Sequence, residues 1–285
     1  MAATGSPRLL LATEHTEQDQ GAERLAFDLA RRAGAPLAAV LPVAFNAEFE
    51  SAAPELAARA DAEVASRRLA LEAAAGGAGV ELDLAVRRGA ELYAEIVEEA
   101  RERASDCIVI RHRGKRSLLA NLLMGEMVAK VVAHAPCSVL VVPREAALWR
   151  RGVLLGLDPQ QPDLTALGRA LGLAGDFAVP LHVVSVAPHA HAQARSDAER
   201  VLQHALAQAA TSRPGVPTGG EVRVGTVHAE LIAAAGAQGA DLLVIGRHGG
   251  GAIARAWIGG VAQKVIGLAT CPVLVHVPPS STTQR

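Results

Sequence analysis

The sequence predicts an α/β protein made of two doubly wound, parallel-sheet domains in tandem. The first supporting observation is an internal repeat, because several segments of the first half recur in the same order in the second half. The second is the alternation of short apolar runs with segments whose apolar residues recur at helical spacing. Strand followed by helix, repeated, implies right-handed crossovers and a parallel sheet that helices cover on both faces.

The repeat relates the two halves of the 285-residue chain at an offset of 144 residues near the start and 134 to 135 residues further on. The matching segments are residues 8–14 and 152–158, residues 106–110 and 241–245, and residues 135–143 and 270–278. The change of offset places about nine additional residues in the first half, after its second strand. We therefore predict one domain over residues 1–145 and a second over residues 150–285.

The elements of each half follow from the hydrophobic pattern. Four runs of the first half are too short for helices and are predicted to be buried strands: residues 9–12, 37–43, 107–110 and 138–142. Between them, apolar residues at helical spacing predict helices around Leu25 and Leu29, around Leu92, Ile96 and Ala100, and around Leu123, Met127 and Val131. The second half repeats this pattern with Leu202 and Leu206, with Leu231, and with Val261 and Val265.

The composition argues against several classes of function. The net charge is -1, and the chain has four Phe, two Trp and one Tyr, so no basic or aromatic surface for nucleic acid is expected. Residues 1–7 lack a signal-peptide pattern, which favours a soluble cytoplasmic protein without membrane partners. The three cysteines have no C-x-x-C spacing and are expected as buried thiols. We expect a solvated loop rather than a metal site at His189 and His191.

A glycine-rich segment of the second half indicates an anion site. The predicted strand at residues 241–245 runs into Gly246 and Gly249, and Gly259 and Gly260 then open a helix. Ligands of such sheets bind at the carboxyl ends of the strands, where the strand order reverses. Glycines let backbone N–H groups approach an anion, and the free N–H groups of a helix start complete a phosphate cradle.

This pattern resembles the nucleotide motif of the universal stress protein family, which is G-x-x-G, nine residues, then glycine followed by Ser or Thr. Four flanking features agree with the resemblance: Asp158 at the end of the first strand, Leu181 to Val184 as the second strand, Gly225 before a helix, and Cys271 to Val275 as the closing strand. The resemblance implies an adenine nucleotide α-hydrolase-like fold that binds ATP or another adenine nucleotide, with or without Mg²⁺. The implied nucleotide-binding residues are Asp158, Val183, Val184, Gly246, Gly249, Gly259 and Gly260, with Arg247 and His248 as additional donors.

Two departures from the family motif weaken the implied site. Gly260 stands where the family has Ser or Thr, and losing a hydroxyl bond to a charged oxygen costs about 1.5 to 3 kcal/mol. In the first half Arg111 replaces the first glycine, and Glu126 places a carboxylate at the helix start. Glu14 replaces Asp158 there, so we predict that the first half binds no nucleotide and that Glu126 satisfies the helix N-terminus. A solvated loop is favoured over an anion or acidic-partner site for Arg111, Arg113, Lys115 and Arg116.

Two hypotheses of different classes follow. The first is a nucleotide-binding stress-response or regulatory protein that uses the second half. The second is a nucleotide-free interaction module of the same fold. We find no catalytic residue and no metal ligand set, so at most slow ATP hydrolysis is expected, and an adenylate-forming or electron-transferring enzyme is a remote third option.

The resemblance also implies that the closing strands at residues 138–142 and 272–277 pair edge to edge. That pairing makes an intramolecular pseudo-dimer and leaves a homodimer and the protein partner open.

Overall fold

The fold is given by a computed structural model, which describes residues 7–112, 125–247 and 258–278. The strands of this part of the chain are β1 (Leu9–Ala12), β2 (Leu37–Ala44), β3 (Leu82–Gly89), β4 (Cys107–Arg111), β5 (Ser138–Val142), β6 (Val153–Leu157), β7 (Leu181–Ala187), β8 (Thr218–Val224), β9 (Leu242–Gly246) and β10 (Val273–His276). The helices are α1 (Gln20–Ala33), α2 (Ala47–Ala52), α3 (Pro54–Gly77), α4 (Leu92–Glu102), α5 (Glu126–His134), α6 (Leu164–Asp176), α7 (Ala192–Ser212), α8 (Val227–Gln238) and α9 (Gly260–Leu268).

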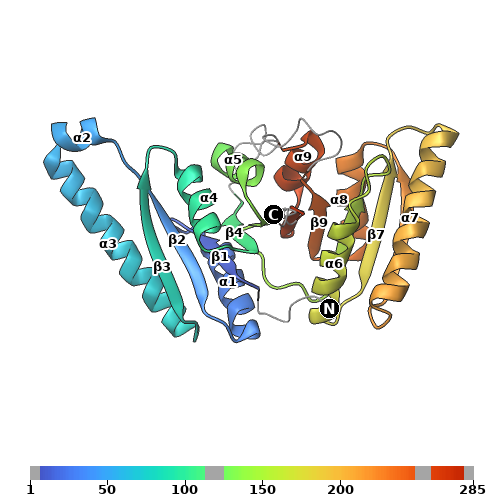
Figure 1. Ribbon diagram of the computed structural model, residues 1–285, viewed down its shortest axis with the longest axis horizontal. Helices are drawn as coiled ribbons and strands as arrows, with labels where there is room; N and C mark the ends of the chain where they lie inside the picture. The colour runs from blue at the N-terminus through green and yellow to red at the C-terminus, as the bar shows by residue number, and fades with distance from the viewer. Residues whose placement is uncertain (1–6, 113–124, 248–257, 279–285) are drawn as a thin grey trace, which may run out of the picture.

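The strands form one continuous sheet in the order β3-β2-β1-β4-β5-β10-β9-β6-β7-β8 (Figure 1). Neighbouring strands are parallel within each half. The halves meet where β5 and β10 pair antiparallel, with Leu140 opposite Leu274. The predicted α/β class, with a doubly wound parallel sheet in each half, is confirmed.

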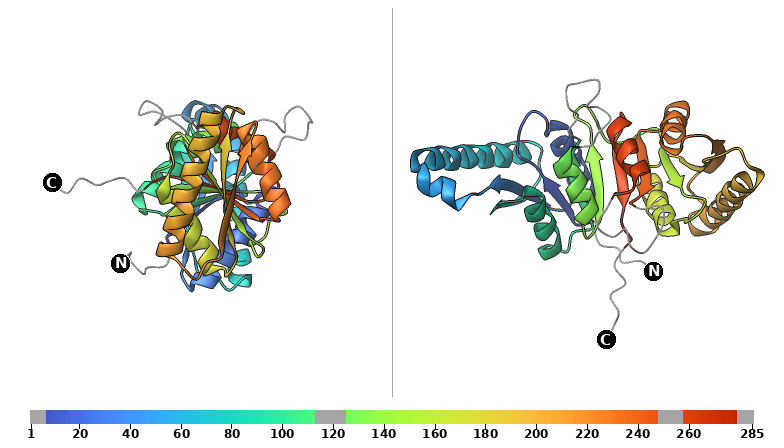
Figure 2. Two further views of the ribbon diagram at one scale, coloured as in Figure 1. Left: turned by 90° about the vertical axis from the view of Figure 1, so that its right-hand side faces the viewer. Right: turned by 90° about the horizontal axis from the view of Figure 1, so that it is seen from above.

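Helices cover both faces of the twisted sheet (Figure 2). Buried residues of α1, α3, α6 and α7 form one apolar core with one face of the sheet, and α4, α5, α8 and α9 form a second core with the other face. Each core continues across the seam between β5 and β10, because side chains from both halves contribute to it. Within the described residues, no helix is both long and apolar enough to cross a membrane.

The outer part of the first half was the hardest to predict. The strands β3 and β8 and the helices α2, α3 and α6 have no counterpart among the predicted elements; most side chains of α3 are exposed, and most of those of β3 are half-buried. In α3, Leu71 and Ala75 are the buried residues, and no clear apolar face results. The additional residues of the first half form α2 and lengthen α3, which has 24 residues against 21 in α7. The predicted helix position Leu123 lies outside the described residues.

The segment between β5 and β6 packs closely on α1. Gly21 lies where a Cβ would come within 2.2 Å of the Pro143 carbonyl oxygen, so a larger residue would push the segment away. The Arg24 guanidinium donates hydrogen bonds to the carbonyl oxygens of Arg144 and Ala146, at 2.9 and 2.8 Å. Trp149, only 2% exposed, anchors the same segment. The connection between the halves is therefore bonded to α1 of the first half, and Trp149 contacts Phe177 of the second half, with 4.5 Å between the ring centres.

A buried histidine contributes polar contacts across the seam. His276 of β10 is 6% exposed, and its Nδ1 lies 3.3 Å from Ser138 Oγ of β5. Its Nε2 lies 2.9 Å from Thr165 Oγ1 at the start of α6. Burial lowers the pKa of His276 below its ordinary value of 6.5, and the positive charge of Arg169 adds to this effect, whereas the negative charge of Asp163 opposes it.

The stability of the fold should fall as pH decreases through about 6.5, because the unfolded chain then binds a proton that folded His276 does not. We expect the His276→Gln variant to show a weaker decline of the unfolding free energy between about pH 7 and pH 5, measured by urea denaturation. His204→Gln, which changes an exposed histidine of α7, is the matched control. An unchanged slope in His276→Gln would show that His276 is not responsible.

Candidate functional site

A cavity of about 310 Å³ lies in the second half, at the carboxyl ends of β6, β7 and β9. The starts of α8 and α9 close its other side. Its lining residues are Gly156, Leu157, Asp158, Pro159, Gln160, Gln161, Asp163, Val186, Pro188, Val227, Leu231, Ile245, Gly246, Arg247, Gly259, Gly260, Val261 and Ala262. The sheet therefore has a pocket at the edge where the sequence predicted a ligand.

Five of the sequence-predicted residues line this cavity together: Asp158, Gly246, Arg247, Gly259 and Gly260. They come from three separate segments that follow β6, end β9 and open α9. The family motif predicted that these residues lie together. The structure places the Asp158 carboxylate and the start of α9 in one pocket.

The remaining predicted residues lie elsewhere. Val183 and Val184 are fully buried inside β7, and neither lines the cavity. Val186, one alternation further along the strand, lines it instead. His248 and Gly249 lie outside the described residues.

The start of α9 supplies the anion-binding feature of the cavity. Gly259 is the N-cap residue, and as a glycine it has no side chain with which to cap the helix. Gly260, Val261 and Ala262 begin the helix and line the pocket. The backbone N–H groups of a first helical turn have no acceptor within the helix, and the helix dipole adds a partial positive charge. This end of the cavity can therefore hold a phosphate or another anion.

The opposite wall carries a carboxylate and an apolar surface. Asp158 is half-buried, and its Oδ1 accepts a hydrogen bond of 2.8 Å from the Gln160 backbone N–H. A Cβ on Gly156 would lie 2.9 Å from Leu231 Cδ2, so this glycine allows α8 to approach β6. Sequence reasoning missed Gly156 and Leu231 as wall residues, although a glycine inside an apolar strand is a signal of close approach.

Arg247 uses its side chain to contact the first half. Its Nη1 donates to the carbonyl oxygens of Ala133 and Ala135 at 3.3 and 2.9 Å, at the C-terminal end of α5. An arginine is favourable there because the last carbonyls of a helix carry partial negative charge. Burial lowers the pKa of Arg247. The guanidinium thus links the cavity of the second half to a helix of the first.

The corresponding region of the first half contains an internal ion cluster. Arg111 occupies the position of Gly246 and is 2% exposed. Its Nη1 donates to Asp19 Oδ2 at 2.6 Å and to Thr16 Oγ1 at 3.2 Å, while its Nη2 donates to Glu14 Oε1 at 3.0 Å. Glu14 stands where the second half has Asp158. A buried guanidinium therefore neutralises the carboxylates at the position of the second-half cavity.

The structure corrects two expectations about this region. Glu126 does not satisfy the start of α5, because its side chain is 84% exposed and pairs with Lys130 at 3.2 Å. The solvated loop expected for Arg111 is also wrong, since burial among carboxylates gives it hydrogen-bond partners that a sequence pattern does not reveal. The other basic residues of that cluster, Arg113, Lys115 and Arg116, lie outside the described residues.

Removing the guanidinium should destabilise the first half strongly. We expect Arg111→Ala to lower the unfolding free energy by about 3 to 5 kcal/mol, because Asp19 would stay buried without its partner. Chemical denaturation measures this difference. The control is Arg8→Ala, which breaks a surface ion pair with Asp106 and should change stability much less. Equal losses in the two variants would contradict the buried-cluster interpretation.

Comparisons with known proteins agree with this architecture. The model of the universal stress protein family matches residues 6–143 and 150–278. No curated protein matches the sequence. A universal stress protein from Archaeoglobus fulgidus is 17% identical, with a TM-score of 0.70 over 95% of this chain and 96% of the other. A structure from Pseudomonas aeruginosa, assigned to the same family, is 19% identical, with a TM-score of 0.67 over 96% of this chain and 94% of the other.

A shorter A. fulgidus universal stress protein, solved in complex with dAMP, is 21% identical and covers 45% of this chain and 98% of its own length, with a TM-score of 0.37. The two long structural matches show the same fold over nearly the whole chain. Because the family model matches each half separately, the chain belongs to the universal stress protein family and carries two family domains in tandem.

Proposed function

We propose that the cavity of the second half binds an adenine nucleotide, ATP or AMP, and that its occupancy gives the chain a regulatory role in a stress response. One observation carries the proposal: the uncapped start of α9 opens into the same cavity as the carboxylate of Asp158. An anion-binding end and a hydroxyl-binding end in one pocket suit a phosphorylated nucleoside.

The proposal assigns a part of the ligand to each wall. Asp158 accepts hydrogen bonds from the ribose hydroxyl groups, and the adenine packs against the apolar wall near Val186. The phosphates bind backbone N–H groups of the first turn of α9, from Gly260 onward, beside Gly246 and Gly259. Within the same proposal, Gly249 and His248 complete the loop, while the Arg247 side chain binds carbonyl oxygens of the first half. Val183 and Val184 support the wall from within the sheet.

The first half is proposed to bind no nucleotide. The Arg111 guanidinium already donates hydrogen bonds to Glu14 and Asp19. An entering phosphate would therefore be repelled by two carboxylates, and the arginine beside them is already bonded. We infer that the first half serves as a partner for the second through the seam of β5 and β10, as an intramolecular pseudo-dimer. A cytoplasmic location belongs to the same proposal. No catalytic residue forms part of it, and slow ATP hydrolysis would need only water and the phosphate cradle.

Gly260 gives the sharpest test of the phosphate cradle. A Cβ there meets nothing within 4 Å, so substitutions are accommodated. We expect Gly260→Ser to bind AMP about 10 to 100 times more tightly, because a hydroxyl donor is added, and Gly260→Glu to lose binding through repulsion. Isothermal titration calorimetry measures both constants. Gly236→Ser, on the exposed face of α8 outside the cavity, should bind like the unaltered chain.

Thermal unfolding separates this proposal from a nucleotide-free interaction module. AMP, or ATP with and without Mg²⁺, at a hundred times its dissociation constant should add about 2.7 kcal/mol of stability. If millimolar nucleotide stabilises neither the unaltered chain nor the Gly260→Ser variant against thermal unfolding, the nucleotide-free interaction module is favoured.

Light scattering tests the intramolecular pairing. If the two halves satisfy one another within a chain, the protein should have the 29.4 kDa mass of a single chain at micromolar concentration. A mass twice as large in the unaltered chain would support a homodimer through an additional surface or through exchange of the halves.

A further inference from the structure

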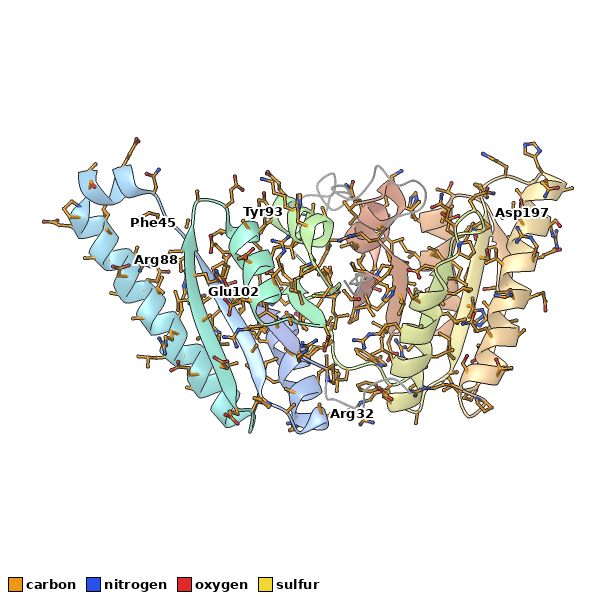
Figure 3. All side chains as sticks on the ribbon, in the orientation of Figure 1. Arg32, Phe45, Arg88, Tyr93, Glu102 and Asp197 are labelled. Atoms are coloured by element: carbon orange, nitrogen blue, oxygen red, sulfur yellow. The ribbon has the colours of Figure 1, made fainter. Side chains whose placement is uncertain are left out.

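A second cavity, separate from the nucleotide pocket, lies between the two halves. It has a volume of about 290 Å³ and sits between α1 and α6, over the sheet at the seam. Side chains of strands from both halves form its floor, including Leu140 of β5 and Leu274 of β10. The C-terminal ends of α1 and α6 form its sides, and Figure 3 shows Arg32 at this place between the halves. Its size is near the lower end of the range of small-molecule sites.

Three charged side chains line the cavity: Arg32, Arg169 and Asp176. Arg169 of α6 lines the cavity and is half-buried, yet it forms no hydrogen bond or ion pair within residues 7–112, 125–247 and 258–278. Arg32 and Asp176 have other partners among the described residues. Arg32 donates to the Asp176 carbonyl oxygen and lies 4.6 Å from the centre of the Phe177 ring, while Arg213 lies 3.5 Å from the Asp176 carboxylate.

A buried donor supplies a second, independent observation. Trp149 lines the same cavity and is 2% exposed, and its indole Nε1 has no hydrogen-bond partner in the part of the chain that the structure describes. A buried N–H group without an acceptor has lost the hydrogen bond that it makes in water, so such groups normally have a partner. The lining therefore contains two arginines, one carboxylate and the indole of Trp149 among apolar side chains.

The internal repeat shows that only the second half has an arginine at the position of Arg169. The offset of 144 residues pairs Leu29 with Leu173 and places Leu25 at the position of Arg169. Leu25 is fully buried in the same apolar core, so a leucine suits that helical position. The arginine is consequently not required by the fold, and it breaks the approximate symmetry of the two halves at this cavity.

We propose that this cavity is a binding site for a small monocarboxylate with an apolar body. The carboxylate pairs with Arg169 and accepts a hydrogen bond from Trp149, and the apolar body contacts leucines of the sheet and helices. A doubly charged phosphate ester fits less well, because the Asp176 carboxylate that lines the cavity repels a double negative charge more than a single one. The site is independent of the proposed nucleotide pocket, which lies at the strand ends of the second half.

Decanoate is a suitable probe, and Trp149 can report its binding directly. The chain has two tryptophans, so Trp257→Phe leaves Trp149 as the single emitter. In this background we expect decanoate to change the emission saturably. Adding Arg169→Leu should raise the decanoate dissociation constant about 10- to 100-fold, because a charge-assisted hydrogen bond is lost.

The controls separate a carboxylate site from general apolar binding. Decanol has a similar body without the charge, and it should bind the unaltered cavity more weakly than decanoate and be nearly insensitive to Arg169→Leu. Arg195→Leu removes an exposed arginine of α7 and should leave decanoate binding unchanged. Saturating AMP should also leave it unchanged, which distinguishes this site from the nucleotide pocket. Circular dichroism confirms that each variant is folded.

Two results would overturn the proposal. One is an emission of Trp149 that does not respond to decanoate up to millimolar concentration. The other is equal binding of decanoate and decanol in the chain that retains Arg169, since the guanidinium would then contribute nothing to recognition.

Discussion

The antiparallel pairing of β5 and β10 is the constraint on which the rest of the structure depends. Both strands are buried along their whole length, so either half alone would expose an apolar sheet edge with unpaired backbone groups. Pairing them satisfies these groups and joins two five-stranded sheets into one. It also aligns the cores on both faces, which places α1 beside α6 and brings Arg247 to the end of α5. The cavity between the halves exists because of the same pairing.

The two halves show how one fold can keep or close the same pocket. An aspartate stands before the first helix of each half. Asp163 caps α6 by accepting backbone N–H groups, whereas Asp19 forms no cap and accepts from Arg111 instead. A glycine in place of Arg111 leaves room in the second half, and the long guanidinium fills that room in the first. A single side chain, together with carboxylates at the neighbouring positions, is enough to fill with an internal ion cluster the region that is a cavity in the second half.

The sequence predicts the central elements well because burial leaves a clear pattern there. The apolar runs of β1 and β5 were placed at their observed ends, and the repeat fixed both halves. The helix α3 is mostly exposed and has no clear apolar face. The strand β3 was missed although Leu82, Leu84 and Val86 alternate along it, because its side chains are only half-buried. In the site, the motif spacing identified the glycines and Asp158. It could not show that Arg247 would cross to the first half or that Arg111 would be buried, because both depend on contacts between residues far apart in the chain.

Arg247 makes the two halves energetically dependent on one another. Its backbone lines the cavity of the second half, where its carbonyl oxygen accepts a hydrogen bond from the Gly259 N–H at 3.3 Å. Its side chain holds carbonyl oxygens of the first half. Any ligand that shifts Gly259 therefore acts on a residue bonded to α5, and by linkage a change at α5 alters the free energy of binding at the cavity by the same amount. The first half can in this way influence the cavity of the second half.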